Sequence, residues 1–366
     1  MVAGLTWRWA AVAAGTGALL SLPALAGALP AGGSDATAQQ LLERVRSSPQ
    51  VAWSGYGTSR GTLVVPDVSE LSDLPGLIGE TTRARAWWRG AEDWRVDAVA
   101  LTGEVDTTRD PDGGWTWESA DRRAVRIVGE LDVRLPGAAD LLAPVLGHRL
   151  AGTADVTASR LPARRVAGRA ADGLRLVPRD PRATTVRSVD LWVEPGTGLT
   201  LHLEVRTAAA LPSLTSTLLD LDLAVPDASL TDFPRPRRAS VATGRAPDIA
   251  AAADRFAPYA LPDELAGLPR RARSTLSTGG GVGTYGDGFT ALAVVPVPHD
   301  LGHQLVDRID PQDDDGIAAI GTPLVNARVV LAQDERAYVL VGTVPPDRLA
   351  TAGARLRAVP PPFVPR

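Results

Sequence analysis

The chain has 366 residues, a formal net charge of −4 at pH 7 and a composition that is 45% hydrophobic. This length predicts about two domains, and the near-neutral charge gives no support for a nucleic-acid partner. The absence of Cys excludes disulfides, thiolate metal sites and an N-terminal lipidated cysteine. All 38 basic residues are Arg, so the Gly-rich stretch Gly279–Gly283 is not a P-loop, which needs a lysine to contact phosphate.

The first segment along the chain is an apolar N-terminus that predicts export. Arg8 is the only charged side chain before the run Trp9–Leu29, which consists almost entirely of Ala, Leu, Val and Gly. The Ala-Leu-Ala at 24–26 is a small-x-small pattern typical of signal-peptide cleavage. The run is also long enough, at about 20 residues, for an uncleaved membrane anchor. We therefore expect residues 1–33 to be a signal peptide or an N-terminal membrane anchor, and the rest of the protein to be exported to the cell envelope.

Residues 37–230 are predicted to form a domain built on one sheet. It begins with a short helix, Ala38–Ser47, followed by a Gly-containing alternating run, Val51–Val65, which predicts a curved strand. The next segment, Pro66–Glu80, is too apolar for an ordinary solvated loop, and we expect it to act as a lid. Further strands are expected at Arg83–Arg89, Asp93–Leu101, Glu104–Arg109, Trp115–Asp121, Arg122–Val128, Val156–Val177 and Leu214–Val225, with a short helix at Gly137–Leu146.

The clearest strand signal of this domain is Val186–Thr207. Two alternating apolar and polar runs flank the loop Glu194–Gly198, which predicts an antiparallel hairpin with one continuous apolar face. Its outer face then places Asp190 opposite His202, and we interpret these two residues as structural. The predicted pairs on the apolar face are Val193 with Leu199, Leu191 with Leu201, and Val189 with Leu203.

Composition separates a second, smaller domain from the first. Residues 231–250 are rich in Pro, Arg, Ser and Thr and are interpreted as a linker. Residues 251–358 are expected to form a small α+β domain, and residues 359–366 a Pro-rich tail. In the second domain, strands are expected at Ala272–Ser277, Phe289–Val297, Ala327–Leu331 and Ala337–Gly342, and helices at His299–Ile309 and from Pro346 to Arg357.

Three motifs partly match known catalytic or metal sites. Gly57–Gly61 matches the Gly-x-Ser-x-Gly nucleophile elbow around Ser59, but strand residues follow it instead of the helix that the elbow requires. His299 and His303 share a helical face at the spacing of metal ligands, yet no Glu follows the first His and no third ligand is placed, which favours a solvated helix. The acidic stretch 310–316 lacks the ligand pattern of a calcium loop. We therefore expect no catalytic residues, no metal site and no cofactor.

The tryptophans of the first domain remain as candidates for a ligand site. Trp115 and Trp117 share one strand face, and Trp94 and Val96 share another. These side chains are either ordinary core aromatics or the lining of a concave sheet that binds an acyl chain. A one-residue error in strand phase would exchange the two faces. The candidate lipid-binding residues are Trp87, Trp94, Val96, Trp115, Trp117 and Trp192, with Leu74 and Leu77 from the lid.

Several of these segments resemble one known family. Leu191-Trp-Val-Glu-Pro-Gly-Thr-Gly-Leu199 resembles the Leu-Trp-Leu-Asp-x-x-Thr-Gly-Leu hairpin of the RseB/MucB family and of its LolA-type lipoprotein-carrier relatives. Arg83–Asp97 and Gly114–Trp117 resemble strands of the same fold. In the second domain, Tyr285–Phe289 and Val341–Pro346 resemble the C-terminal domain of RseB. The matches occur in the same order along nearly all of the chain after the N-terminal segment.

The resemblance implies an α+β protein, with a half-open antiparallel β-barrel (LolA-like) capped by helices and a smaller C-terminal α+β domain. It also implies a non-enzymatic, periplasm-type regulator of a sigma-E-like stress response. Such a regulator binds the extracytoplasmic part of a membrane anti-sigma factor and is released by a lipid or lipoprotein acyl chain. The alternatives are an envelope lipid or lipoprotein carrier and, more remotely, an envelope hydrolase based on Gly57–Gly61. The lipid, the anti-sigma contact surface and the oligomeric state stay open.

Overall fold

The computed structural model describes residues 31–61, 81–100, 103–111, 113–127, 137–233, 240–244, 261–271, 282–308, 319–332 and 336–358. The predicted lid with Leu74 and Leu77, the Pro-rich tail and all but residues 31–33 of the predicted signal peptide or anchor lie outside these ranges. Among the described residues, no helix has the length and apolar character needed to cross a bilayer.

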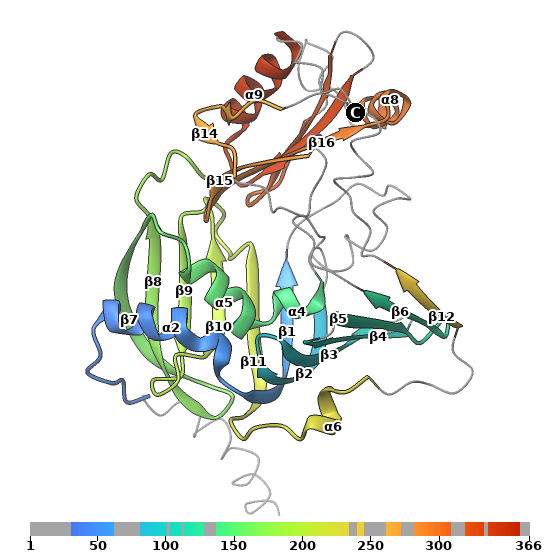
Figure 1. Ribbon diagram of the computed structural model, residues 1–366. Helices are drawn as coiled ribbons and strands as arrows, with labels where there is room; N and C mark the ends of the chain where they lie inside the picture. The colour runs from blue at the N-terminus through green and yellow to red at the C-terminus, as the bar shows by residue number, and fades with distance from the viewer. Residues whose placement is uncertain are drawn as a thin grey trace, which may run out of the picture.

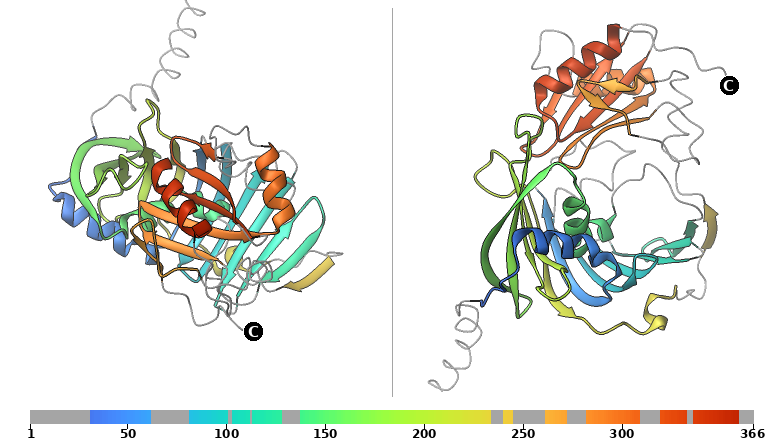
Figure 2. Two further views of the ribbon diagram at one scale, coloured as in Figure 1. Left: turned by 90° about the horizontal axis from the view of Figure 1, so that it is seen from above. Right: turned by 60° about the vertical axis from the view of Figure 1, so that its left-hand side comes forward.

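The larger unit is built on one twelve-stranded sheet, in the order β12-β6-β5-β4-β3-β2-β1-β11-β10-β9-β8-β7. Every neighbouring pair is antiparallel except β12 and β6, and β7 and β12 are the two edges. The sheet curves into an open trough (Figure 1 and the right-hand view of Figure 2). The strands are β1 Trp53–Gly61, β2 Thr81–Gly90, β3 Asp93–Ala100, β4 Gly103–Asp110, β5 Gly113–Glu118, β6 Arg123–Ile127, β7 Val156–Val166, β8 Arg169–Pro178, β9 Ser188–Val193, β10 Thr200–Arg206, β11 Leu214–Asp222 and β12 Ser240–Gly244. The last of these falls within the segment interpreted from composition as a linker.

Three helices lie inside the trough: α2 (Ala38–Ser47), α4 (Ala138–Leu141) and α5 (Ala143–Ala151). Helix α2 begins at a capping box, in which the Thr37 side chain accepts from the Gln40 backbone and the Gln40 side chain accepts from the Thr37 backbone. Its Leu41, Leu42 and Val45 are buried against the sheet and α5. The short helix α6 (Ala228–Thr231) lies instead under β2, β3 and β4 on the outer side. The helices therefore distinguish an inner face of the sheet from an outer face.

The hairpin β9–β10 forms as predicted, but its register is different. Leu201 is an extra residue in β10, where the pairing shifts between Thr200 and His202. The bulge lies where α5 comes closest to the sheet, since a Cβ on Gly147 would be 2.3 Å from the Thr200 hydroxyl oxygen. Leu199 and Leu201 consequently pack in a different core cluster from Val189, Leu191, Val193, Leu203 and Val205, and the prediction of one continuous apolar face is wrong. The observed pairs include Val193 with Thr200, Leu191 with Leu203 and Val189 with Val205.

The smaller unit is a five-stranded antiparallel sheet in the order β15-β16-β19-β18-β17, with one helix on each face. Helix α9 (Pro346–Ala358) packs at Gly353 on Val330, whereas α8 (His299–Arg308) packs at Gly302 on Ala337. Because Val330 pairs with Tyr338 and Ala337 with Leu331, the two contacts are on opposite sides of the sheet. The strands of this sheet are β15 Gly283–Asp287, β16 Thr290–Val297, β17 Ala319–Gly321, β18 Asn326–Leu331 and β19 Ala337–Gly342. The short strands β13 Glu264–Leu265 and β14 Leu268–Pro269 pair with each other in a separate two-stranded sheet.

The two units share a hydrophobic core. Phe289 and Leu324 from the smaller unit pack into the cluster formed by α2, α5 and the β8–β10 strands. The loop before β9 reaches across, with the Thr185 backbone N–H donating to the Thr343 carbonyl at 2.8 Å and the Thr185 hydroxyl donating to the Leu324 carbonyl at 2.6 Å. The Thr184 hydroxyl donates to the Phe289 carbonyl. The predicted fold class is confirmed: an α+β protein with a half-open, helix-capped antiparallel barrel and a smaller α+β unit.

Candidate functional site

The inner face carries a row of three stacked tryptophans. Trp53 pairs directly with Trp88, and Trp88 pairs with Trp94, on the adjacent strands β1, β2 and β3. Their rings stack with centroid separations of 6.2 Å and 5.4 Å. The indole N–H groups of Trp88 and Trp94 donate to the carbonyls of Pro49 and Ala91, so the stack leaves no indole N–H of these two rings unpaired. The row forms an apolar wall inside the trough.

Helix α4 and the start of α5 cover one end of this wall, and the other end is less covered. Ala139 and Leu142 pack in the same cluster as Trp53, Trp88 and Val96. Trp94 is only half-buried. Farther along the inner face, Val105 on β4 is 40% exposed. An apolar surface that continues beyond the helices is the feature that an acyl ligand requires.

The outer face carries the other described tryptophans, three of which lie beneath an arginine. Their strand pairings place Trp87, Trp115, Trp117 and Trp192 on the face opposite the helices. Guanidinium carbons lie over three of the rings, with Arg164 at 3.4 Å from the Trp192 centroid, Arg95 at 5.6 Å from Trp87 and Arg126 at 6.0 Å from Trp115. Phe233 also stacks on Trp115 at 4.7 Å. These rings are held by cation–π and stacking contacts.

The predicted lipid-binding set is thus divided between two faces, which is a correction to the idea of a single lining. Trp94 and Val96 lie on the inner face, and the other four described members lie on the outer face. Adjacent residues of a strand point to opposite sides, so choosing Trp87 meant leaving out Trp88. Trp53 and Trp88 are the inner-face residues that the sequence reasoning missed. The signal that could have found them is direct cross-strand pairing with Trp94.

The outer face of the hairpin buries a network of charges around Asp190. This side chain is 2% exposed and receives two hydrogen bonds of 2.7 Å from the Arg175 guanidinium, with a third of 3.0 Å from Arg206. His202 lies diagonally from Asp190, because the bulge pairs it with Trp192 and pairs Asp190 with Glu204. The prediction that Asp190 and His202 are direct neighbours is therefore wrong. Burial, and then the Arg164 charge, lower the pKa of His202 to about 4.

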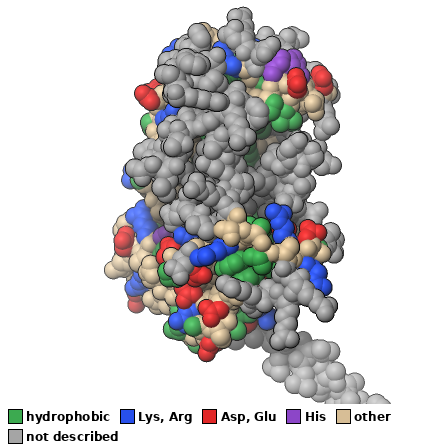
Figure 3. Space-filling model, turned by 45° about the vertical axis from the view of Figure 1, so that its right-hand side comes forward, with side chains coloured by type: hydrophobic (Ala, Val, Ile, Leu, Met, Phe, Trp, Pro, Cys, Tyr) green, Lys and Arg blue, Asp and Glu red, His purple; other side chains and the backbone are tan. Residues whose placement is uncertain are grey.

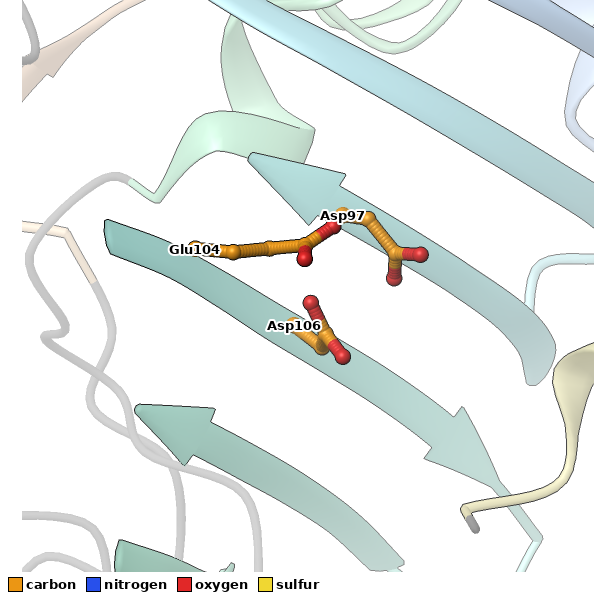
Figure 4. Close-up of side chains that lie close together, drawn as sticks. All are labelled: Asp97, Glu104 and Asp106. Atoms are coloured by element: carbon orange, nitrogen blue, oxygen red, sulfur yellow. The ribbon is translucent and has the colours of Figure 1, made fainter. Parts of the chain in front are cut away.

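A second outer-face cluster brings together three carboxylates on β3 and β4. The oxygens of Asp97, Glu104 and Asp106 lie within 4.8 Å of one another (Figure 4). The Arg95 guanidinium already donates to Asp97 at 2.6 Å and to Asp106 at 3.0 Å. Burial, together with the Asp97 charge, raises the pKa of Asp106 to about 6. Because an arginine occupies the space between two of the carboxylates, we interpret the cluster as an ion-pair network and assign no metal to it.

The nucleophile-elbow motif lies within a strand. Ser59 is 4% exposed, inside β1, on the face covered by the helices. An elbow needs a sharp turn that presents the serine at the end of a strand. Because Ser59 lies inside a strand, its hydroxyl does not have the position that an elbow requires.

A cleft of about 610 Å³ lies between the two units. The larger unit contributes Thr153, Asp155 and Asp180 to its lining, and the smaller unit contributes Phe289, Arg271 and Arg348 among others. Its walls therefore mix charges of both signs with an aromatic side chain that reaches into the shared core. Such a lining is suited to a polypeptide segment more than to a small apolar ligand.

Together these features define a two-unit α+β protein whose larger unit is a half-open barrel with an apolar inner wall. Its sequence matches no protein-family model and no curated protein. The fold is similar to that of a chain in the complex structure of Pseudomonas aeruginosa MucA/MucB, with TM-score 0.50 and 16% identity over 86% of this chain and 96% of that one. A crystal structure of MucB matches with TM-score 0.48, 17% identity and coverage of 88% and 98%. A LolA superfamily protein from Nitrosomonas europaea has TM-score 0.25, 15% identity and coverage of 54% and 98%.

Proposed function

We propose that the protein is an exported, non-enzymatic regulator that binds the extracytoplasmic part of a membrane anti-sigma factor and thereby controls an extracytoplasmic-function sigma factor. The observation that carries the proposal is the fold similarity to the chain of the MucA/MucB complex, which extends over both units. The RseB-like motifs, which occur in the same order along both units, support it independently.

A lipid or lipoprotein acyl chain bound inside the half-barrel is the proposed signal. The support is the inner wall of Trp53, Trp88 and Trp94, open toward Val105. A ligand shifts the population between partner-bound and free states only if its affinity for the two states differs. Phe289 and Leu324 of the smaller unit pack in the core beside this wall. Phe289 also lines the cleft, so a ligand that changes the packing of the barrel core would also affect the cleft.

The regulator is favoured over a simple carrier by the way the two units are joined. A carrier would need only the half-barrel, whereas here the smaller unit completes the core of the larger one. Removal of residues 248–366 would uncover that core, so truncation would not separate the two functions. The full chain is the appropriate material for the test.

Photo-crosslinking in cells tests the partner. In one variant a photoreactive residue replaces Arg271, which lines the cleft. In the control variant it replaces Leu211, which is 77% exposed and does not line the cleft. We expect the Arg271 probe, and not the Leu211 probe, to capture a single-span membrane protein with a sigma-binding cytoplasmic segment. Capture of lipoproteins alone would favour the carrier.

Displacement of a fluorescent acyl probe tests the ligand site. The Trp94→Ala variant removes a half-buried ring from the inner wall, and the Trp117→Ala variant removes a half-buried ring from the outer face. We expect weaker probe binding for the first variant and unchanged binding for the second. The opposite result would place the acyl chain on the outer face.

A further inference from the structure

We propose that helix α8 carries a solvent-facing site for a divalent late transition-metal ion, with the Nε2 atoms of His299 and His303 as its two protein ligands. Structural zinc sites take four protein ligands and catalytic zinc sites take three, so the pair matches neither class. The proposed site is instead a surface chelate in which water fills the remaining positions around the ion.

The distance between the two nitrogens fits chelation of one ion. His299 Nε2 and His303 Nε2 are 3.2 Å apart. Two nitrogens that each bind a metal at 2.0–2.1 Å are separated by about 2.9 Å at a right angle and about 3.3 Å at the tetrahedral angle. The observed separation lies between these values, so little rearrangement of the rings is needed to bind both nitrogens to one ion.

The packing of α8 holds the pair at the surface. Gly302 is buried where the helix meets the sheet, and a Cβ there would be 2.6 Å from the Ala337 Cβ. This contact sets the rotation of the helix and leaves His303 exposed and His299 half-buried. Figure 3 shows histidine side chains at the surface of this unit next to acidic ones. Asp300 and Asp307 are exposed on the same helix, so the local charge also favours a cation.

The donor type decides the class of ion. Neutral imidazole suits Zn²⁺, Ni²⁺ and Cu²⁺, whereas Mg²⁺ and Ca²⁺ prefer oxygen ligands. For a site with fixed ligands, affinity rises to Cu²⁺ along the first-row series. Cu²⁺ is therefore the tightest-binding probe for the site, and Mg²⁺ is the negative control.

The test uses the metal-stripped full chain titrated with Cu²⁺ by calorimetry, with nitrogen hyperfine structure in the electron paramagnetic resonance spectrum as a second readout. A matched variant combines His303→Gln with Gln304→His. Gln304 is also exposed on α8, so this variant keeps the number of histidines but moves the second one off the shared face. Weak Cu²⁺ binding elsewhere in the chain is the same in both proteins.

We expect one Cu²⁺ per chain, with two nitrogens in its coordination sphere. The shifted variant and His299→Gln should bind at least roughly tenfold more weakly, since even outer-shell partners of metal ligands change affinity by 10–100-fold. Unchanged circular dichroism would show that the variants are folded. Affinity for Cu²⁺ in the shifted variant equal to that of the wild type would overturn the proposal and leave the pair as a hydrogen bond between two rings.

Discussion

The two faces of the twelve-stranded sheet bury aromatic side chains by different physical means. On the inner face, Trp88 packs between Trp53 and Trp94 under the helices. On the outer face, Trp192 lies under the Arg164 guanidinium at 3.4 Å, beside a buried network of carboxylates and arginines. The inner row is thus stabilised by exclusion of water from apolar surface, whereas on the outer face cation–π contacts and paired charges are added to the apolar packing of Trp192.

This difference explains why the number of tryptophans in a sheet is a poor guide to its ligand face. An amphipathic ring is stabilised on a solvated face when a guanidinium covers it. All the cationic side chains of this protein other than histidine are arginines, and arginine stacks on aromatic faces more readily than lysine. The inner tryptophans Trp53, Trp88 and Trp94 instead stack on one another and pack among apolar neighbours.

The largest effect is expected from truncating the middle of the inner row. Trp88→Ala removes a side chain that is 8% exposed, and it should lower the free energy of unfolding by about 3–5 kcal/mol. The matched variant Trp87→Ala, on the half-buried outer side, should cost about 1 kcal/mol. Denaturant unfolding of both proteins measures the difference, and equal losses would show that the two faces contribute alike.

Breaking the charge pairing of the outer face should have the next largest effect. Asp190→Asn leaves Arg175 without its carboxylate partner and leaves Arg206 paired with Glu204 alone, and hydrogen bonds to charged groups contribute about 1.5–3 kcal/mol. Both arginines are partly exposed, so water compensates for part of this loss. Asp220→Asn, at an exposed position on β11, is the control and should change stability little. Thermal unfolding at pH 7 compares them.

The buried His202 should make the stability of the outer face depend on pH. Its pKa is lowered to about 4 by burial, whereas an unfolded histidine titrates near 6.5. Between these values the unfolded chain binds the extra proton, so stability falls as the pH drops from about 6.5 to about 4. His202→Gln should lose this dependence, as measured by denaturant unfolding at pH 7 and pH 5. A difference between the two proteins that does not vary with pH would contradict the prediction.

The smallest expected effect, of opposite sign, comes from Asp106. Its pKa is raised to about 6, whereas an unfolded aspartate titrates near 3.9. The native state therefore binds the extra proton in this window, and its contribution to stability grows as the pH falls from about 6 to about 4. The advantage of the wild type over Asp106→Asn should increase over that range. A decrease would show that the Arg95 ion pair, and not burial, dominates at this position.

Local periodicity was sufficient for most strands of the larger unit, although β12 lies in a segment interpreted as a linker. Alternation of apolar and polar residues predicted the hairpin around Glu194–Gly198. The placement of Leu41, Leu42 and Val45 on one helical face predicted the helix Ala38–Ser47, whose bounds agree with the structure. It also predicted that Trp115 shares a face with Trp117 and that Trp94 shares a face with Val96. These features depend on local periodicity, which a single sequence displays in full.

The tertiary structure determined which face of the sheet is enclosed and which residues of the hairpin pair with each other. The bulge at Leu201 lies where α5 approaches Thr200, a contact between segments more than 50 residues apart in the sequence. The assignment of Trp88 to the inner face and of Trp87 to the outer face depends on where α4 and α6 pack. Periodicity shows that two neighbouring side chains point to opposite sides, but only the packing of other elements on the sheet determines which side is enclosed.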